Sequence, residues 1–253
     1  MKLNVFFTPI SIDELYFTHK TTVVIDVLRA SSTIVAALKN GAKEVVPVAT
    51  VEFAMKVSGG MFGGQTLLCG ERNTKKIEGF ALGNSPLEFT EKVVKGKSII
   101  LYTTNGTRAI VKAKFSENLF VCSLENLSAV AHHLVRLNED VEILCSGKSN
   151  TFSLEDSICA GKLSTEIMKT KEDVELSDAA RASVSLSKSF GKNILKMLQE
   201  TEHGKILIGN GFNDDLKYCS KLDITNIIPY FSGNALKILP NNLEGESNKN
   251  KTE

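Results

Sequence analysis

Apolar and polar positions alternate along this chain in blocks that predict strands and helices in turn. Short continuous runs of Val, Ile, Leu and Phe are typical of strands that are buried on both faces. The predicted strands are 3–7, 22–27, 44–48, 66–69, 98–103, 119–122, 141–145, 205–208 and 226–231. The predicted helices are 11–17, 32–39, 51–57, 85–95, 107–114, 126–137, 153–169, 177–190, 192–200 and 212–220. We therefore expect a three-layer α/β/α fold with a mixed, largely parallel sheet between two layers of helices.

The alternation of strands and helices continues from residue 1 to residue 240, which predicts a single α/β domain. An alternative arrangement of this domain has two sublobes around a crevice. The glycine-rich segment GGMFGG (59–64) is interpreted as a flexible connector. It lacks the Gly-Lys-Ser/Thr that a phosphate-binding loop needs. Residues 241–253 contain no aromatic side chain and one apolar residue, Leu243, so they predict a disordered tail.

The segment IDVLRASSTIVAAL carries the clearest chemical signal. An apolar strand ends at Asp26, and a small-residue helix follows the polar stretch that contains Arg29, Ser31 and Ser32. The free N–H groups and dipole at a helix start favour an anion, and a carboxylate beside it can hold a metal that binds the same anion. This pattern favours metal-assisted chemistry on a phosphate or a similar oxyanion. The alternative is that Asp26 only caps the helix or pairs with Arg29.

Two later junctions share this strand–polar loop–helix pattern. In sheets of this kind, ligands bind outside the carboxyl ends of the strands, so the three loops are expected to meet at one crevice. For the Asn-Gly pair at 105–106, an ordinary turn is the alternative. The polar residues of these two junctions are Thr104, Asn105, Gly106, Thr107 and Arg108 in the first, and Ser146, Gly147, Ser153 and Asp156 in the second.

The segment 69–89 is long, polar and without clear periodicity. It contains Glu71, Arg72 and Lys76 and leads to Ser85-Pro86, a helix start with Pro at the first helical position. Loops of this length in compact domains are often functional. A solvated, charged loop is the alternative.

Composition excludes several functional classes. The 253 residues carry a formal net charge of +1 with mixed signs and few aromatics, so nucleic-acid binding is not expected. No apolar run reaches the roughly 18–20 residues that span a bilayer, and the segment 1–10 shows no signal-peptide pattern. The five cysteines form no C-x-x-C pair, which favours free thiols in a reducing cytoplasm. A homodimer is expected only because homodimers are common.

Other acidic residues and the histidines carry weaker signals. Asp214, Asp215 and Asp223 are interpreted as capping or surface residues, and His203, before a glycine, as the end of a helix. No Walker loop, D-x-D, C-x5-R or H-x-G-x-R motif occurs, so several common phosphatase chemistries lack support. Carboxylates with Mg²⁺, arginine and helix termini could still supply the charge that phosphoryl transfer needs.

Several long motifs in order resemble the ComB family of 2-phosphosulfolactate phosphatases. They are IDVLRASSTIVAAL, GERNTKKIEGFALGNSPLEF, YTTNGTRA, FSLEDSICAG, LSDAARA and HGKILIGNGFNDDLKYCSKLDITNIIPYF. The resemblance covers the chain from about residue 4 to about residue 240. It implies a Mg²⁺-dependent phosphatase that converts 2-phosphosulfolactate to 3-sulfolactate and phosphate, a step toward coenzyme M. A small substrate with phosphate, carboxylate and sulfonate groups would suit the basic and polar loops.

With this resemblance, the candidate residues take roles. Asp26 and Glu71 are the predicted catalytic residues, and Asp26, Glu71 and Asp156 are the predicted Mg²⁺ ligands. The predicted substrate-binding residues are Arg29, Ser31, Ser32, Arg72, Lys76, Thr104, Asn105, Gly106, Thr107, Arg108, Ser146, Gly147 and Ser153.

The sequence leaves the chemistry open. Either a metal-activated water attacks the phosphate or Asp26 forms an aspartyl-phosphate. The same loops could serve a phosphatase for another phosphorylated 2-hydroxy acid or a non-catalytic binding module for a phosphorylated or sulfonated metabolite. In a third reading, the loops are ordinary caps of a structural scaffold.

Overall fold

A computed structural model describes residues 1–60 and 65–240. The glycine-rich segment around 61–64 and the predicted tail 241–253 lie outside the described residues. The strands are β1 (Lys2–Phe6), β2 (Thr21–Ile25), β3 (Glu44–Val48), β4 (Thr66–Arg72), β5 (Lys75–Lys76), β6 (Ser98–Tyr102), β7 (Asn118–Cys122), β8 (Val141–Cys145), β9 (Glu175–Leu176), β10 (Pro229–Ser232) and β11 (Ala235–Ile238). The α-helices are α1 (Ala30–Lys39), α2 (Val51–Gly60), α3 (Glu91–Val94), α4 (Gly106–Lys112), α5 (Leu127–Leu137), α6 (Leu154–Thr170), α7 (Asp178–Phe190), α8 (Ile194–Glu200), α9 (Glu202–Gly209) and α10 (Asn213–Cys219). Three 3-10 helices are η1 (Glu14–Phe17), η2 (Pro86–Glu88) and η3 (Leu124–Asn126).

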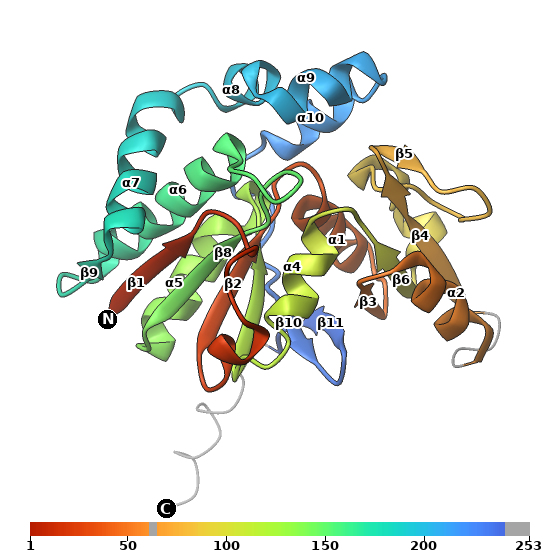
Figure 1. The fold of residues 1–253 in the computed structure, drawn as a ribbon, viewed down its shortest axis with the longest axis horizontal. Helices are drawn as coiled ribbons and strands as arrows, with labels where there is room; N and C mark the ends of the chain where they lie inside the picture. Colours follow the sequence, from red (N-terminus) through yellow and green to blue (C-terminus); the bar gives the residue numbers. More distant parts are fainter. Residues whose placement is uncertain (61–64, 241–253) are drawn as a thin grey trace, which may run out of the picture.

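The described strands form one sheet in the order β5-β4-β6-β3-β11-β10-β7-β2-β8-β1-β9. The pairs β4–β6, β3–β6, β7–β2, β2–β8, β8–β1 and β1–β9 are parallel. The hairpin β10–β11 lies between β7 and β3 and is antiparallel to both. Helices pack on both faces (Figure 1). The predicted three-layer fold with a mixed, largely parallel sheet is therefore confirmed.

Alternate residues of β2 enter different hydrophobic cores, which explains why its last three residues, Val23, Val24 and Ile25, form a continuous apolar run. Val23 and Ile25 pack with residues of α5 and α6, whereas Val24 packs with residues of α1 and α4. All five residues of β2 are buried. A strand buried on both faces cannot alternate apolar and polar residues, which is why continuous runs located the strands in the sequence.

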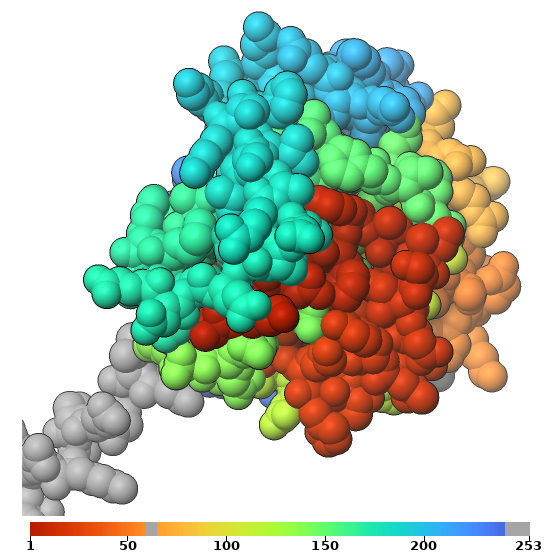
Figure 2. All heavy atoms as spheres, turned by 60° about the vertical axis from the view of Figure 1, so that its left-hand side comes forward, coloured from red at the N-terminus to blue at the C-terminus, as the bar shows by residue number. Residues whose placement is uncertain are grey.

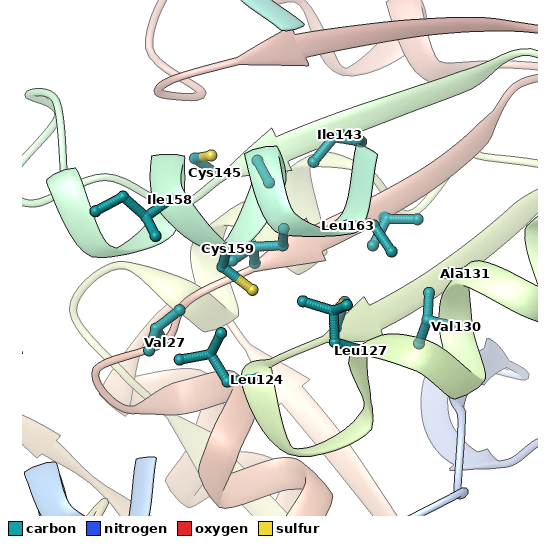
Figure 3. Packing of buried hydrophobic residues seen from close by; sticks show 14 of the residues in the cluster. Val27, Leu124, Leu127, Val130, Ala131, Ile143, Cys145, Ile158, Cys159 and Leu163 are labelled. Atoms are coloured by element: carbon teal, nitrogen blue, oxygen red, sulfur yellow. The ribbon is translucent and has the colours of Figure 1, made fainter. Parts of the chain in front are cut away.

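The first of these cores holds the strand ends in place from one side of the sheet. In it, Cys159 and Leu163 of α6 lie opposite Leu124 and Leu127, which belong to η3 and the start of α5 (Figure 3). All five cysteines are buried free thiols, as the absence of a disulfide pattern predicted. These thiols act as small apolar side chains in the described structure.

The segment 177–220 is mostly helical, with α7 packed against α6 and β1 and with α8, α9 and α10 in contact with one another. In Figure 2, α7 comes forward in cyan next to the red N-terminal strand β1, and α8, α9 and α10 lie together at the top in blue. Figure 1 shows the same three helices above the end of the sheet. These helices thus cover one side of the crevice at the strand ends.

Three predicted elements differ from the structure. Of the predicted helix 11–17, only the 3-10 helix η1 (Glu14–Phe17) forms. The run KILI at 205–208 was expected to be a strand but lies in α9, because Thr201 caps a helix there by accepting a hydrogen bond from the N–H of Gly204 at 3.0 Å. In that helix Leu207 is buried while Ile206 is 41% exposed, so the apolar run is not a buried strand. The predicted helix 85–95 is split into η2 and α3. Short apolar runs do not by themselves distinguish strand from helix.

Within the described ranges, no helix has both the length and the apolar character required to cross a bilayer.

Candidate active site

Loops from the carboxyl ends of four strands meet in one pocket with a volume of about 240 Å³. We call it the strand-end pocket. It includes Asp26, Glu71 and Asn105, so the loops that the sequence predicted to converge do so. Its lining residues are Asp26, Leu28, Arg29, Glu71, Asn73, Thr74, Asn84, Thr103, Thr104, Asn105, Lys148, Ser149, His203 and Ile206.

Asp26 lies at the end of β2 and is 6% exposed. Its Oδ1 accepts a hydrogen bond from the N–H of Ala30, the first residue of α1, at 3.1 Å, although the N-cap position itself is occupied by Arg29. Burial and, to a smaller extent, the negative charge of Glu71 raise the pKa of Asp26 to about 6, although hydrogen bonds from Ser146 and Ala30 oppose the shift. A carboxylate whose ionised form is costly here would be stabilised by a cation in the pocket.

Gly106 allows the β6 loop to approach Asp26 closely. A Cβ atom at position 106 would lie 2.5 Å from Asp26 Oδ2 and 2.4 Å from the Cβ of Ala30. Both distances are far inside van der Waals contact. The predicted importance of Gly106 therefore has a steric cause, namely space for the carboxylate, and Gly106 does not line the pocket.

Glu71 joins the loops that follow β4 and β6. Its Oε2 accepts from the N–H of Thr74 and its Oε1 accepts from the N–H of Thr104, both at 2.7 Å. The residue is 6% exposed and lines the pocket. Each carboxylate oxygen has further lone pairs, so Glu71 can hold the loops and still face a ligand.

Asp156 lies behind this pocket and does not line it. Its Oδ1 accepts from the N–H of Val27 at 2.8 Å, and its Oδ2 accepts from Ser146 Oγ at 3.1 Å and from the N–H of Gly147 at 3.2 Å. Burial and the negative charges of Asp26 and Glu155 raise the pKa of Asp156 well above its usual range. In this structure Asp156 positions the loops after β2 and β8.

Arg29 is buried and is held by other parts of the protein. Its Nη1 donates to Asp215 Oδ2 at 2.7 Å and its Nη2 donates to the carbonyl of Thr74 at 2.8 Å. The guanidinium carbon lies 4.2 Å from the ring centroid of Phe212. Arg29 lines the pocket. The alternative drawn from the sequence was a pair between Arg29 and Asp26, but the acidic partner of Arg29 in the structure is Asp215.

The prediction of Asp215 as a capping or surface residue is wrong. Asp215 is 2% exposed, and its Oδ1 also accepts from Ser85 Oγ at 2.6 Å. A buried charge requires such partners. The pair joins α10 to the loop after β2, two segments 186 residues apart in the sequence.

Four predicted substrate-binding residues form hydrogen bonds within the protein: Ser31, Ser32, Thr107 and Ser153. Ser31 Oγ accepts from the N–H of Asp26 at 2.9 Å, and Thr107 Oγ1 accepts from the N–H of Thr103 at 2.9 Å. Ser32 Oγ donates to Glu125 at 3.1 Å, and Ser153 caps α6. None of these four predicted residues (Ser31, Ser32, Thr107, Ser153) lines the strand-end pocket.

Three predicted basic residues also lie outside this pocket. Arg72 and Lys76 are exposed, at the end of β4 and on β5. Arg108 is exposed on α4 and lines a second cavity of about 290 Å³, which we call the distal hollow. The distal hollow shares Thr104 and Asn105 with the strand-end pocket. Its lining residues are Pro9, Ile10, Glu14, Ala49, Thr104, Asn105, Arg108, Val111, Lys112, Ser146 and Asn150.

His203 is a pocket residue that sequence reasoning missed. It lies in the first turn of α9 and not at a helix end, because Thr201 caps that helix. Its side chain hydrogen-bonds the backbone of Leu28. Burial and then the positive charge of Arg29 lower the pKa of His203 to about 4, so the imidazole is neutral at pH 7. Thr201, a residue type that is preferred at helix N-caps, was the available signal for a helix start.

Lys148 and Asn84 also line the pocket and had no predicted role. Lys148 pairs with Glu202 at 3.0 Å, and its side chain is 25% exposed. Asn84 Oδ1 is buried without a hydrogen-bond partner, and so is Thr104 Oγ1. A buried oxygen without a partner is costly unless a ligand satisfies it.

The donor set at the pocket fits a hard cation. Asp26 and Glu71 line the pocket together with Asn84 and Thr104, each of which has a buried oxygen without a hydrogen-bond partner. Mg²⁺ prefers oxygen ligands and is commonly held by one or two carboxylates and several waters. Among residues 1–60 and 65–240, no three His, Cys, Asp or Glu side chains are grouped for metal binding. A cation here would therefore depend on amide or hydroxyl oxygens in addition to carboxylates.

The family model for 2-phosphosulpholactate phosphatase matches residues 6–234. The chain belongs to this family. Curated relatives match over nearly their whole length, and each carries the name probable 2-phosphosulfolactate phosphatase. The protein of Caldanaerobacter subterraneus subsp. tengcongensis is 42% identical over 90% of this chain and 95% of its own. That of Clostridium acetobutylicum is 41% identical over 92% and 98%, and that of Clostridium botulinum is 36% identical over 93% and 99%.

Proposed function

We propose that this protein is a Mg²⁺-dependent phosphatase that hydrolyses 2-phosphosulfolactate to 3-sulfolactate and phosphate, as in coenzyme M biosynthesis. The observation that carries the proposal is the strand-end pocket, where Asp26 and Glu71 lie with two unpartnered buried oxygens. The names of the relatives supply the substrate. The free thiols fit a cytoplasmic location.

Asp26, Glu71, Asn84 and Thr104 would hold the magnesium ion. When bound, the ion would neutralise phosphate charge and lower the pKa of a bound water. Asp156, which the sequence suggested as a third ligand, would instead orient Asp26 through the loop at Ser146. The negative charge of Asp26, which burial makes costly, would then be balanced by the cation.

The protein's own groups would complete the site. Lys148 supplies positive charge at the pocket wall, where a phosphate dianion would bind. The neutral imidazole of His203 can accept a proton from an attacking water or exchange one with the leaving oxygen. Arg29 keeps its guanidinium fixed at the wall through Asp215 and Thr74, and Asp215 balances its charge.

Asp26 has two chemical roles open to it, nucleophile or metal ligand beside an attacking water. Rapid acid quench during turnover, followed by mass spectrometry of the peptide with Asp26, distinguishes them. A phosphorylated Asp26 shows the covalent route, and turnover without this species shows attack by water.

The proposal is tested by a phosphate-release assay with a panel of phosphorylated 2-hydroxy acids. We expect release from 2-phosphosulfolactate with Mg²⁺ and none after EDTA, with recovery when Mg²⁺ is added back. Faster release from another ester of the panel would assign that ester as the substrate instead. Calorimetric binding of the ester with no phosphate release would contradict an enzyme and favour a binding module.

A further inference from the structure

The distal hollow adjoins the strand-end pocket at Thr104 and Asn105, which line both cavities. Asn105 Oδ1 accepts from the N–H of Ser149 at 3.1 Å, which orients its amide group at the boundary. The unpartnered hydroxyl of Thr104 lies at the same boundary. A small ligand that spans these two residues would reach both cavities.

The hollow has two cations without acidic partners. Arg108 and Lys112 are four residues apart on α4, so their side chains lie on one face of the helix. Among the described residues, neither forms an ion pair, and the one carboxylate of the hollow, Glu14, pairs with Lys114 at 3.3 Å. Like charges at this spacing repel each other. An anion bound between them would remove this repulsion.

The rest of the hollow suits a small organic acid. Pro9, Ile10 and Val111 give it an apolar wall, and Ser146 and Asn150 add polar groups. Ser146 also hydrogen-bonds the carboxylate of Asp26, so the hollow reaches the residue at the centre of the proposed reaction. Carbon atoms between two acidic groups could lie against the apolar wall while each acidic group faces its own cavity.

We propose that the distal hollow is the binding site for the sulfonate of the substrate, held by Arg108 and Lys112 while the phosphate lies in the strand-end pocket. This inference rests on the proposed function, and it makes these two residues specificity determinants. A sulfonate is a full anion at every physiological pH and can accept two parallel N–H bonds from an arginine. The hollow would thus favour phosphate esters with a second strong acid over simple ones.

The test compares two esters that differ only in the sulfonate, 2-phosphosulfolactate and 2-phospholactate. We expect Arg108→Gln and Lys112→Gln each to raise KM for the sulfonated ester roughly tenfold with little change in kcat. The preference for the sulfonated ester should shrink by the same factor. Lys92→Gln on α3 removes the same charge at an exposed position outside both cavities and should leave the preference unchanged.

An unchanged preference in both variants would overturn the inference while leaving the phosphatase proposal intact. If the unaltered protein hydrolyses neither ester, the phosphatase proposal fails, and calorimetric titration with 3-sulfolactate and lactate decides the inference. Tighter binding of 3-sulfolactate that is lost in Arg108→Gln would support a sulfonate site. Equal binding in the two proteins would refute it.

Discussion

Asp26 and Glu125 are both buried carboxylates near α1, yet their surroundings differ in one decisive respect. Burial raises the pKa of Asp26 to about 6 and that of Glu125 to about 7, and serine hydroxyls hydrogen-bond both. Asp26 lines the strand-end pocket, whereas Glu125 is 0% exposed and lines neither cavity at the strand ends. A raised pKa therefore reports burial, and access to a cavity separates the candidate catalytic group from the structural one.

The structure shows why Glu125 is closed off from solvent. It lies in η3, directly after β7, where its Oε2 accepts from Ser32 Oγ and from Ser123 Oγ. Its Oε1 is buried and has no partner. These contacts tie η3 to α1, so Glu125 holds two elements together without facing a ligand.

Replacing Asp26 with Asn gives the largest expected effect and tests the functional half of this comparison. We expect turnover to fall by at least roughly 10⁴-fold, because the neutral amide can neither hold a cation strongly nor act as a nucleophile. The melting temperature should change by only a few degrees, since Asn keeps the acceptor for Ala30 and removes a buried charge. Phosphate release and thermal unfolding measure the two results.

Glu125→Gln is the matched control, since it makes the same acid-to-amide change at a buried site. It should retain the turnover of the unaltered protein. If Asp26→Asn is fully active, or if both variants lose turnover equally, the distinction between the two carboxylates has no functional meaning.

His203 extends the comparison from acids to bases. We expect His203→Gln to lower kcat by roughly 10²- to 10³-fold, because proton transfer at the pocket would be lost. Because the pKa of the imidazole is lowered to about 4, His203 should contribute no inflection to the pH profile of kcat/KM between about pH 5 and pH 8. Steady-state kinetics across that range measure both results.

His133 provides the control for that experiment. It is half-buried on α5, and its ring centroid lies 5.0 Å from that of Phe120. Burial and then Arg136 lower its pKa, but it does not line the pocket. His133→Gln should therefore keep full turnover, and similar losses in the two variants would remove His203 from the proposed chemistry.

The sequence predicted those parts of the site whose signals are local. Asp26 ends an apolar strand, and the polar residues beside it mark a helix start, so a short window contained the whole pattern. The junction after β8 lies beside this one because β8 is the hydrogen-bonded neighbour of β2. The junction after β6 is different, because β3, β11, β10 and β7 separate β6 from β2 in the sheet, and its loop reaches Asp26 through the close approach at Gly106. The fold therefore followed from periodicity, whereas the sheet order alone accounts for only part of the convergence of the loops.

Other parts depended on contacts between distant segments. Asp215 lies on a short amphipathic helix, and nothing near it in the sequence indicates that its partner is Arg29, 186 residues away. His203 reaches the pocket only because α8, α9 and α10 fold over the strand ends. Arg108 follows directly after the Thr104–Thr107 loop, but its direction on α4 places it in the distal hollow. The direction of a side chain on its helix and the packing of distant segments determine where these three residues lie. Neither can be inferred from the residues next to them in the sequence.

The smallest expected effect concerns stability, and it sharpens the structural half of the comparison. The ordinary pKa of a glutamate, 4.5, is raised to about 7 for Glu125 in the folded protein. Below about pH 4.5 the carboxyl is protonated in both states, and it adds no pH dependence there. As the pH rises from about 4.5 to about 7, the unfolded chain loses this proton while the folded protein keeps it. The free energy of unfolding should therefore fall across this window, by up to about 3 kcal/mol at about 1.4 kcal/mol per pKa unit.

Glu125→Gln should remove this decrease, because the amide has no proton to lose in this range. Urea unfolding at intervals between pH 4.5 and pH 8 measures the free energy of unfolding of both proteins, and their difference isolates the contribution of Glu125. The difference should grow in favour of the variant as the pH rises and become constant above about pH 7. A difference that does not vary with pH would show that Glu125 keeps its ordinary pKa. The 0% exposure of Glu125 would then not determine its ionisation, and the contrast with Asp26 would rest on access to the pocket alone.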